Sequence, residues 1–420
     1  MPDRTVAVPF GKDGTLSLSI PESRIAAVLT PNPVALPPQD RVIPDALARP
    51  RSSPALGAFL GNAGKVLVIV NDATRPTPTR RFLEALLPDL EGRSVSVLVA
   101  TGIHDALTED EKSYLFGPLK DRFTIHCHNS RTSPVEHIGD SKNGTPLLIN
   151  RLVFEHDKVI LTGSVEPHYF AGYTGGRKGF MPGVAGYESI ERNHAHALHP
   201  ESKLLSLEHN PVHQDMADAL SVILDRVDVF SMQAVLDGDH NIVAVETGHV
   251  RDSFEAAVEA CNRIYAVPFR EKSDIVVAVC SFPMDSNLYQ SQKGLESGKL
   301  ALEPGGILIL VSECRNGLGE GLFVKLLRAG RSPADVLHKI RGDYVLGAHK
   351  AASIAKLASE SEIWLYSKLP AAQLDGLHLR PIPDLAGGIE EASRRKPNGK
   401  ITFLFSASTL VPLQEAPVPA

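Results

Sequence analysis

The sequence has few cysteines and no excess of positive charge. Its four cysteines are scattered over 420 residues and form no CxxC pair, which argues against a disulfide framework and a structural zinc site. Lys and Arg number 43 against 49 Asp and Glu, and the net charge is −6. Because nucleic acids and anionic membranes favour a clustered basic surface, we expect neither as a partner.

Long apolar runs are also missing. No run reaches the roughly 20 residues that a membrane-spanning helix needs, and the N-terminus has no basic segment followed by an apolar one. Together with the scattered cysteines, this pattern predicts a soluble protein of the reducing cytoplasm. Hydrophobic residues make up 43% and charged residues 22%, which excludes the disordered and fibrous classes.

Short apolar runs rich in β-branched residues alternate with stretches of helical spacing. The runs lie at 65–70, 94–100, 121–127, 157–163, 227–235, 274–280, 305–312, 362–367 and 400–406. Helical spacing marks 79–90, 211–227 and 254–267. This alternation predicts α/β units around mostly parallel sheets.

We expect two α/β domains. They are residues 1–267 and residues 268–420, and the cleft between two such domains is the expected place for a ligand. The segment 268–274 has the composition of a linker. The proline-containing first 60 residues are expected to be irregular and 411–420 to be frayed, because their periodicity is weak.

Polar side chains follow the apolar run 65–70. Asp72, Thr74 and Arg75 precede two prolines, which places a carboxylate, a hydroxyl and a guanidinium at the mouth of the sheet. The planar guanidinium of Arg75 suits a carboxylate or a phosphate. The alternative is that Asp72 caps the next helix and Arg75 pairs with a surface acid.

His104 follows the next apolar run. A histidine at the end of a strand is well placed for acid/base chemistry, because its ordinary pKa lies near neutrality. The alternative is an inert loop histidine. Thr108 and Glu111 have the spacing of a capping box that opens a helix.

A glycine-rich loop follows the run 157–163. It includes Gly175 and Gly176, which would let backbone amides approach an anionic ligand. Lys178 lies in this loop without the glycine spacing of a P-loop, so we interpret it as a ligand clamp or a covalent attachment point. The alternative is that the glycines are structural.

Histidines are clustered in two places. At about 100° per helical residue, His194 and His196 face about 200° apart, so they cannot bind one metal ion together. A metal at His194 therefore needs ligands from elsewhere. We interpret the group His126, Cys127 and His128 as incidental.

In the second series of α/β units, polar residues follow the run 274–280. Gln290 and Lys293 are three positions apart on an expected helix, with Tyr289 beside them, so they could line one face of the cleft. The alternative is an ordinary polar helix.

Taken together and in this order, these motifs resemble the nickel-dependent lactate racemase family, which includes racemases and epimerases of malate, other 2-hydroxy acids and sugar acids. The matching motifs are D-A-T-R-P at 72–76, T-G-I-H at 101–104, E-P-H at 166–168, G-G-R-K at 175–178, P-G at 182–183, N-H at 193–194, N-P at 210–211, Y-Q-S-Q-K at 289–293 and E-C-R-N-G-L-G at 313–319.

The resemblance implies a cofactor, the nickel-pincer nucleotide. This is a pyridinium-3,5-bisthiocarboxylic acid mononucleotide with nickel, attached through a thioamide, here to Lys178. His194 would be the protein ligand of the nickel. Asp72 and Thr74, with the amides of Gly175 and Gly176, would hold the nucleotide or orient the site. Cofactor-biosynthesis proteins are then implied as partners for loading.

The resemblance also implies the reaction. A small-molecule 2-hydroxy acid would be inverted at C2 by reversible hydride transfer to the nucleotide, while His104 and His168 act as acid and base. Arg75 would support the substrate in the catalytic site. The residues implied to bind the substrate's carboxylate are Tyr289, Gln290 and Lys293, of which Lys293 also counts as catalytic. Residues 1–267 would then be the catalytic and cofactor-binding domain, and residues 268–420 would be the C-terminal domain that closes over the cleft.

Two departures leave the substrate open. Ala73 stands where many members have histidine, and Asp105 and Ala106 follow His104 where a more basic or proline-containing stretch is expected. Two other functions compete: a cofactor-independent two-histidine racemase that works by proton transfer, and a non-catalytic two-lobed carboxylate-binding protein.

Overall fold

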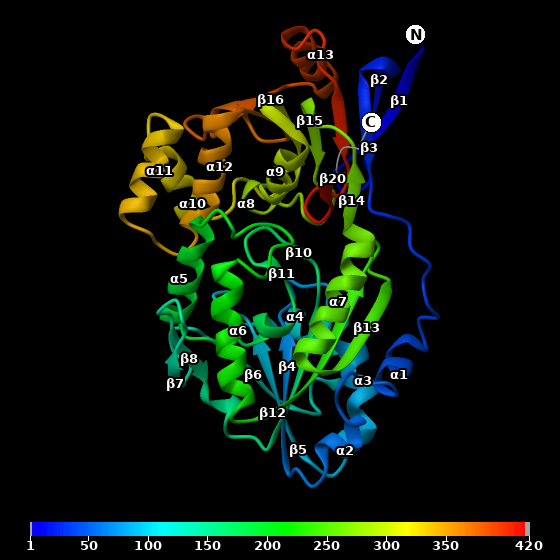
Figure 1. Ribbon diagram of the computed structural model, residues 1–420, viewed down its shortest axis with the longest axis vertical. Helices are drawn as coiled ribbons and strands as arrows, with labels where there is room; N and C mark the ends of the chain where they lie inside the picture. Colours follow the sequence, from blue (N-terminus) through cyan, green and yellow to red (C-terminus); the bar gives the residue numbers. More distant parts are fainter. Residues whose placement is uncertain (1, 416–420) are drawn as a thin grey trace. The chain divides into compact units, whose positions relative to one another are not determined.

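The computed structural model describes residues 2–415. The chain divides into two compact units (Figure 1). One runs from Val34 to Arg263, and the other combines the residues up to Pro33 with those from Ile264 onward. We refer to them as the N-terminal unit and the C-terminal unit.

The N-terminal unit is built on a six-stranded sheet with the order β13-β12-β9-β4-β5-β6. Every neighbouring pair is parallel except β12 and β13. The strands are β4 (Lys65–Asn71), β5 (Ser94–Ala100), β6 (Thr124–Cys127), β9 (Lys158–Ser164), β12 (Asp228–Leu236) and β13 (Ile242–His249). The five strands predicted for this part of the chain are confirmed, and β13 was not predicted.

Apolar residues at the five central positions of β4 explain why this strand lies inside the sheet. Its residues from Val66 to Val70 have no exposed surface, as a strand covered on both faces requires. On one face they pack against Phe82 and Leu86 of α3 (Thr79–Leu90). The helix predicted at 79–90 is confirmed. Its apolar residues recur at helical spacing and form the face that packs on the sheet.

Two other helices of this unit, α4 and α6, begin at recognisable caps. Thr108 and Glu111 form the predicted capping box of α4 (Glu109–Phe116). The side chain of Asn210 accepts from the N–H groups of Val212 and His213 and so caps α6 (Pro211–Leu224). Figure 1 shows α6 and α7 (Val250–Tyr265) in green on one side of the sheet.

Shorter elements complete the N-terminal unit. They are α1 (Val42–Leu47), α2 (Leu56–Leu60), α5 (Tyr187–Ala195), the hairpin of β7 (Val135–Asp140) and β8 (Pro146–Asn150), the hairpin of β10 (Pro167–His168) and β11 (Gly172–Tyr173), and the 3₁₀ turns η2 (Gly117–Leu119), η3 (Arg151–Val153), η4 (Gly176–Gly179) and η5 (His196–Leu198).

The C-terminal unit contains a second six-stranded sheet, which is parallel throughout. Its order is β18 (Arg380–Pro381), β17 (Glu362–Tyr366), β16 (Leu302–Val311), β15 (Ser273–Val279), β19 (Ile401–Leu404) and β3 (Ile25–Leu29). Val276 and Ala278 face one apolar core, while Ile275 and Val277 face another. Its helices are α8 (Leu288–Ser291), α9 (Lys293–Gly298), α10 (Gly321–Arg328), α11 (Pro333–Gly342), α12 (Ala348–Glu360) and α13 (Leu385–Arg395), with the 3₁₀ turns η1 (Glu22–Arg24), η6 (Lys299–Ala301) and η7 (Ala371–Leu374).

The beginning of the chain differs from expectation. The hairpin of β1 (Asp3–Phe10) and β2 (Gly14–Pro21) and the strand β3 are regular, so the prediction of an irregular start is wrong for these residues. They also belong to the C-terminal unit, and not to a domain of residues 1–267. The reason is that β3 pairs with β19, and Val8 and Leu18 pack into the core of that sheet.

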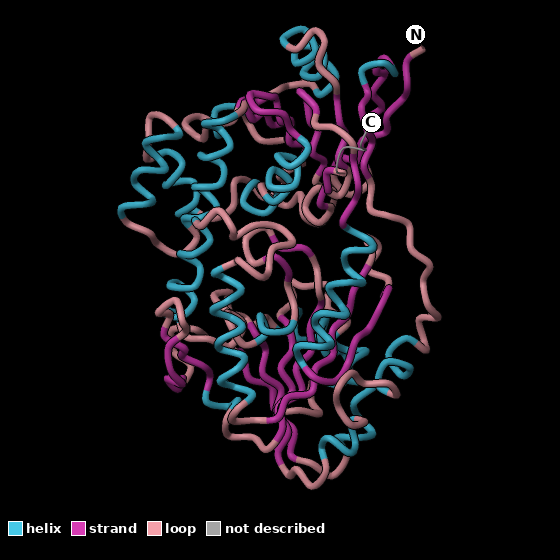
Figure 2. The backbone as a smooth tube through the Cα atoms, in the orientation of Figure 1, coloured by secondary structure: helices cyan, strands magenta, loops and turns pink. Residues whose placement is uncertain are grey.

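The end of the chain also departs from expectation. β14 (Ala266–Phe269) pairs with β20 (Val411–Gln414), so the expected linker and the expected frayed tail both contribute strand residues (Figure 2). The rest of that tail, residues 416–420, lies outside the described residues. None of the helices within 2–415 is both long and apolar enough to cross a membrane.

Candidate active site

Three loops that carry candidate residues leave the same edge of the N-terminal sheet. Since β4, β5 and β9 are parallel neighbours, their carboxyl ends meet there. Asp72 follows β4, His104 follows β5, and the loop with Lys178 follows β9. Two of these loops also touch, because the N–H of Gly102 donates to the carbonyl of Gly183 over 2.9 Å.

His104 is held by Asp72. Its Nδ1 lies 2.6 Å from Oδ2 of Asp72, and the hydroxyl of Thr74 donates to Oδ1 of the same carboxylate over 2.6 Å. Burial raises the pKa of Asp72, but the hydrogen bond and charge of His104, with Thr74 and Arg75, outweigh burial and bring this pKa below its ordinary value. Asp72 is therefore an anion, to which Nδ1–H of His104 donates.

Arg75 lies beside this pair, and its charge contributes to lowering the pKa of Asp72. It forms no ion pair with an acidic side chain of residues 2–415. The helix that follows is preceded by Pro78 and has no side-chain cap. The alternative in which Asp72 caps that helix and Arg75 pairs with a surface acid is therefore wrong.

Three other candidate residues surround the ring of Phe170. The His168 ring centroid lies 4.6 Å from that of Phe170, and the His194 centroid lies 5.1 Å from it. Nζ of Lys178 lies 5.5 Å from the same centroid and 3.3 Å from Nε2 of His168. The N–H of Ala171 donates to Nδ1 of His168 over 3.3 Å. The structure thus brings together His168, Lys178 and His194.

Gly175 and Gly176, which precede Lys178, let the backbone pack closely against neighbouring side chains. Gly175 has φ +80°, and a Cβ there would lie 2.6 Å from Cγ2 of Val165. Gly176 has φ +51°, and a Cβ there would lie 2.9 Å from the ring of Phe254. Because the N–H of Gly176 donates to Oε1 of Gln233 over 2.9 Å, this amide is turned into the protein, and the expectation that it faces a ligand is wrong.

Several residues around Lys178 were not singled out from the sequence. Phe170 is the common neighbour of the three candidate groups, Arg177 is buried beside Lys178, and Asn210 donates to the carbonyl of Phe170 over 2.8 Å. Two of them lie in matched motifs, G-G-R-K and N-P. The contacts of Phe170 with His194 and Asn210 join segments that are far apart in the chain, so no local spacing could have revealed them.

In the C-terminal unit, the candidate substrate-binding residues occupy two short helices. Tyr289 and Gln290 lie on α8 and Lys293 begins α9, where a single helix was expected. Nζ of Lys350 lies 3.2 Å from the ring centroid of Tyr289 and donates to its carbonyl. Burial, with the charge of Glu320, raises the pKa of Tyr289, so its hydroxyl is protonated.

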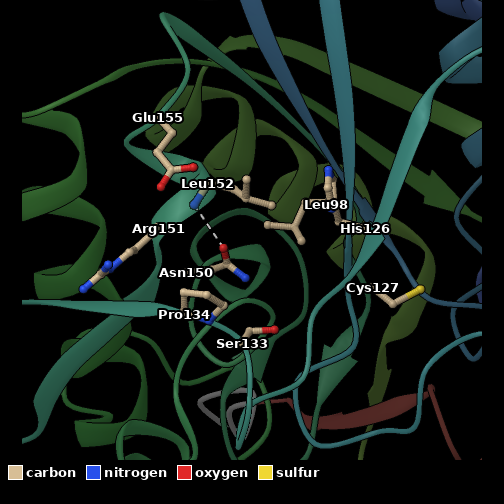
Figure 3. Close-up of a pocket in the computed structure, with 9 residues that line it drawn as sticks. All are labelled: Leu98, His126, Cys127, Ser133, Pro134, Asn150, Arg151, Leu152 and Glu155. Atoms are coloured by element: carbon tan, nitrogen blue, oxygen red, sulfur yellow. Dashed lines mark hydrogen bonds between the residues drawn. The ribbon is translucent and has the colours of Figure 1, made fainter.

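A pocket of about 250 Å³ lies elsewhere in the N-terminal unit (Figure 3). Its lining includes His126 and Cys127 of β6 and Asn150. The neighbouring His128 is buried, with Nε2 near the carbonyl of Ala185 and Nδ1 near Nδ2 of Asn150. Burial lowers the pKa of His128, so this histidine is a neutral structural residue.

The side chains around Phe170 fit the implied cofactor. Imidazole nitrogen suits nickel, and His194 supplies one. Lys178 supplies a partly exposed amine on the same aromatic ring, as an attached nucleotide that reaches the metal would require. Within residues 2–415, no group of three or more His, Cys, Asp or Glu side chains is placed to hold a metal ion.

Comparisons with known proteins agree with the fold and the motifs. The family described as the lactate racemase N-terminal domain matches residues 10–204, and that described as the lactate racemase C-terminal domain matches 269–405. A lactate racemase from Thermoanaerobacterium thermosaccharolyticum is 31% identical over 348 residues, which are 80% of each chain. One from Lactiplantibacillus plantarum is 28% identical over 301 residues, 69% of each chain.

Solved structures give the same result. The lactate racemase apoprotein from T. thermosaccharolyticum has a TM-score of 0.92 at 27% identity and covers 98% of this chain and 100% of its own. A Thermotoga maritima protein has a TM-score of 0.70 at 18% identity, covering 90% and 98%, and shows the fold alone.

The two α/β units and these matches define an isomerase of the racemase class. The chain belongs to the lactate racemase family.

Proposed function

We propose that this enzyme inverts C2 of a 2-hydroxy acid, as a racemase or an epimerase, with a nickel-pincer nucleotide attached to Lys178 and held through nickel by His194. The observation that carries the proposal is the pair His104 and His168. Each imidazole is held through Nδ1, on loops that leave one edge of the sheet, and the second lies against the amine of Lys178.

The cofactor accounts for the chemistry that the side chains lack. Removing a proton from C2 would place a second negative charge beside the substrate's carboxylate, which side chains alone stabilise poorly. The bound nucleotide supplies reversible acceptance of a hydride from C2. Proton transfer then concerns only the hydroxyl group, whose proton a histidine can take near neutral pH.

The chain's own residues bind the substrate and move its proton. Nε2 of His104 or His168 takes the hydroxyl proton, and the other histidine returns a proton after the opposite face of C2 is reduced. Arg75 supports the anionic substrate through its guanidinium. We assign binding of the carboxylate to Tyr289, Gln290 and Lys293 of the C-terminal unit.

The substrate is proposed as a class. Ala73 packs partly buried against the N-terminal core, and Asp105 is exposed in the loop that begins with Gly102. An acidic residue beside His104 favours hydroxyl groups over a second carboxylate in the substrate. The class therefore extends from lactate to polyhydroxy acids.

The test is a loaded enzyme assayed on a panel of chiral 2-hydroxy acids from lactate through malate to gluconate. Protein from a host with the cofactor-biosynthesis proteins should contain nickel, absorb visible light and show a mass increment on the Lys178 peptide. Protein from a host without them serves as the control for loading.

Isotope labelling separates the two racemase mechanisms. Hydride transfer keeps deuterium of a C2-deuterated substrate in the product, whereas a cofactor-independent proton transfer exchanges it with water. Nickel-bearing protein that binds these acids without inverting any of them would instead support a carboxylate-binding protein.

A further inference from the structure

The helix α5 carries the candidate nickel ligand, His194, and has two polar residues on its buried face. Ser189 and Asn193 have no exposed surface. They are four positions apart, so they lie on the same face of the helix. His194 follows Asn193 and projects about 100° further round the helix axis. The contacts of Ser189 and Asn193 therefore fix the rotation of α5 and the direction of His194.

Ser189 joins the first turn of α5 to β8. Its hydroxyl accepts from the N–H of Leu148 over 2.9 Å and donates to the carbonyl of Pro146 over 2.5 Å. Both of these partners belong to β8, which begins directly after the loop of the β7–β8 hairpin. The start of α5 is thus tied to this hairpin.

Asn193 joins the last turn of α5 to α6. Its Nδ2 donates to the carbonyl of Val212 over 3.0 Å and to Oδ2 of Asp215 over 3.4 Å. Nε2 of His196, in the turn that follows α5, lies 3.5 Å from the same oxygen. Asp215 is therefore an acceptor on α6 to which the end of α5 is attached.

Asp215 is also held from the loop of the β7–β8 hairpin. Its Oδ1 accepts from the hydroxyl of Ser141 over 2.8 Å and from Nδ2 of Asn143 over 2.9 Å. Its Oδ2 accepts from the hydroxyl of Thr145 over 2.5 Å. The side chain has no exposed surface, and burying such a group is costly without donors. These hydrogen bonds make the carboxylate a fixed point between the hairpin, α5 and α6.

The neighbour of His194 depends on the same helix. Asn210 caps α6, and its Nδ2 donates to the carbonyl of Phe170 over 2.8 Å. The ring centroid of Phe170 lies 5.1 Å from that of His194. The beginning of α6 thus holds both the helix that carries His194 and the residue whose ring His194 contacts.

We propose that Asn193 and Asp215 are positioning residues that hold His194 in place to bind nickel. The inference rests on the proposed function for the identity of the metal. Asn193 sets the rotation of α5, and Asp215 ties Asn193 to α6 and to the hairpin. Both residues act through α5, and neither is itself a ligand.

The test inverts one hydrogen bond and then restores it. Asn193→Asp keeps the shape of the side chain but turns its donor into an acceptor, which faces the carboxylate of Asp215. Asp215→Asn, added to this variant, supplies a donor again, so the pair is bonded in the opposite sense. The bond to the carbonyl of Val212 is not restored, so the recovery should be partial. The charge at position 193 is the same in both proteins, so a difference between them reports the bond.

Two further variants complete the set. Asn193→Ala removes the donor without adding a charge, and it decides the test if Asn193→Asp does not fold. Ser141→Ala is the control, because Ser141 donates to the same carboxylate from the hairpin loop. This control also loses one hydrogen bond to Asp215, while the bond from Asn193 stays in place.

Proton and carbon-13 NMR of histidine-labelled apoprotein reads the position of His194 without nickel and without activity. The ring of Phe170 shifts the signals of the neighbouring imidazole, and His194→Gln identifies these signals. At a pH of about 8.5, where an ordinary imidazole is neutral, Asn193→Asp and Asn193→Ala should move them. The double variant should bring them back towards their parent positions, and Ser141→Ala should leave them unchanged.

Nickel retention gives the second readout. Loaded protein is mixed with EDTA, and the loss of nickel is followed by visible absorbance. The rate should rise about tenfold in Asn193→Asp and in Asn193→Ala, as is typical when a group that orients a metal ligand is lost. The double variant should recover part of this loss, and Ser141→Ala should behave like the parent protein. The mass increment on the Lys178 peptide should be the same in all variants, because attachment does not depend on His194.

Unchanged His194 signals in both Asn193 variants would overturn the inference, and so would a double variant that recovers nothing relative to Asn193→Asp. The remaining outcome separates the inference from the proposed function. His194 signals that move and recover as expected, in a protein that contains no nickel when it is made in a loading host, would support the positioning role and count against the proposed function.

Discussion

Oδ2 of Asp72 lies 2.6 Å from Nδ1 of His104, while Oδ1 accepts from the hydroxyl of Thr74. Asp72→Asn keeps the shape of this group and removes the charge that fixes the tautomer of His104. We expect kcat to fall about 100-fold or more while the protein stays folded. Racemisation rates in both directions measure the effect. Thr74→Val, which keeps the carboxylate, should cost less than about tenfold, and equal losses in the two variants would contradict a specific role of the carboxylate.

Replacing either acid/base histidine should separate catalysis from metal binding. His104→Ala and His168→Ala should each abolish inversion, because each direction needs one imidazole on either side of C2. Nickel content, measured on purified loaded protein, should stay near one per chain since His194 is intact. Inversion that persists in either variant would exclude the two-histidine mechanism.

The attachment residue should be sensitive to the loss of its amine. Lys178→Arg keeps a positive charge on η4, but a guanidinium cannot form the proposed thioamide. Mass spectrometry of protein from a loading host should show no increment on this peptide, and visible absorbance should disappear after gel filtration. A mass increment on a peptide with another lysine would show that the cofactor is attached there and not to Lys178.

Gly176 should tolerate no side chain. An alanine there combines a strained backbone at φ +51° with a Cβ 2.9 Å from the ring of Phe254. We expect Gly176→Ala to lower the free energy of unfolding by about 2 kcal/mol or more. The control is Gly92→Ala, at φ +77° with no atom within 4 Å of its Cβ, which should cost about 1 kcal/mol. Urea unfolding of both variants measures the difference that packing makes.

His213 should make the protein sensitive to acid. Burial, together with the charge of Arg177, lowers the pKa of His213 from its ordinary 6.5 to about 3 in the folded chain. The unfolded chain therefore binds a proton as the pH falls below 6.5, and the folded chain does so only near 3, so stability falls across that window. The full effect, reached near pH 3, is about 5 kcal/mol.

Nε of Arg177 donates to Nδ1 of His213 over 2.8 Å. His213→Gln keeps an acceptor for Arg177 and should remove this part of the acid sensitivity. Urea unfolding at neutral pH and at about pH 4 compares the variant with the parent protein. The control is His209→Gln, because the side chain of His209 is 73% exposed. The same acid sensitivity in the parent and in His213→Gln would show that His213 does not titrate as described.

Much of this fold could be predicted because short stretches of sequence determine its helices and strands. The helix α3 and the strand β4 follow from the spacing of their apolar residues, and the capping box of α4 from two residues three positions apart. The start of the chain was misjudged. The first 60 residues were judged together by the prolines near residue 35. The alternation of apolar and polar residues in β1, which is typical of a strand, was therefore overlooked.

The candidate site divides in the same way. His104 and Asp72 were predicted because each follows a buried strand, and parallel strands bring their carboxyl ends together. The contact between them, and the hydrogen bonds that Arg177 and Asn210 donate to the carbonyls of Ala171 and Phe170, depend on side chains that meet only after folding. Gly176 shows what the sequence cannot predict. The glycine-rich composition of its loop suggested an amide open to a ligand, but the hydrogen bond to Gln233 turns that amide into the protein.

The pairing of β3 with β19 has a consequence for synthesis on the ribosome. The N-terminal unit is complete once Arg263 has emerged, whereas Ala27 must wait for Thr402, its partner in the register. During translation β3 therefore waits for its partner strand while the N-terminal unit folds, and its backbone N–H and C=O groups stay open to wrong pairing. A nascent-chain protease assay should find residues 25–29 cleavable until residues 401–404 have emerged from the ribosome.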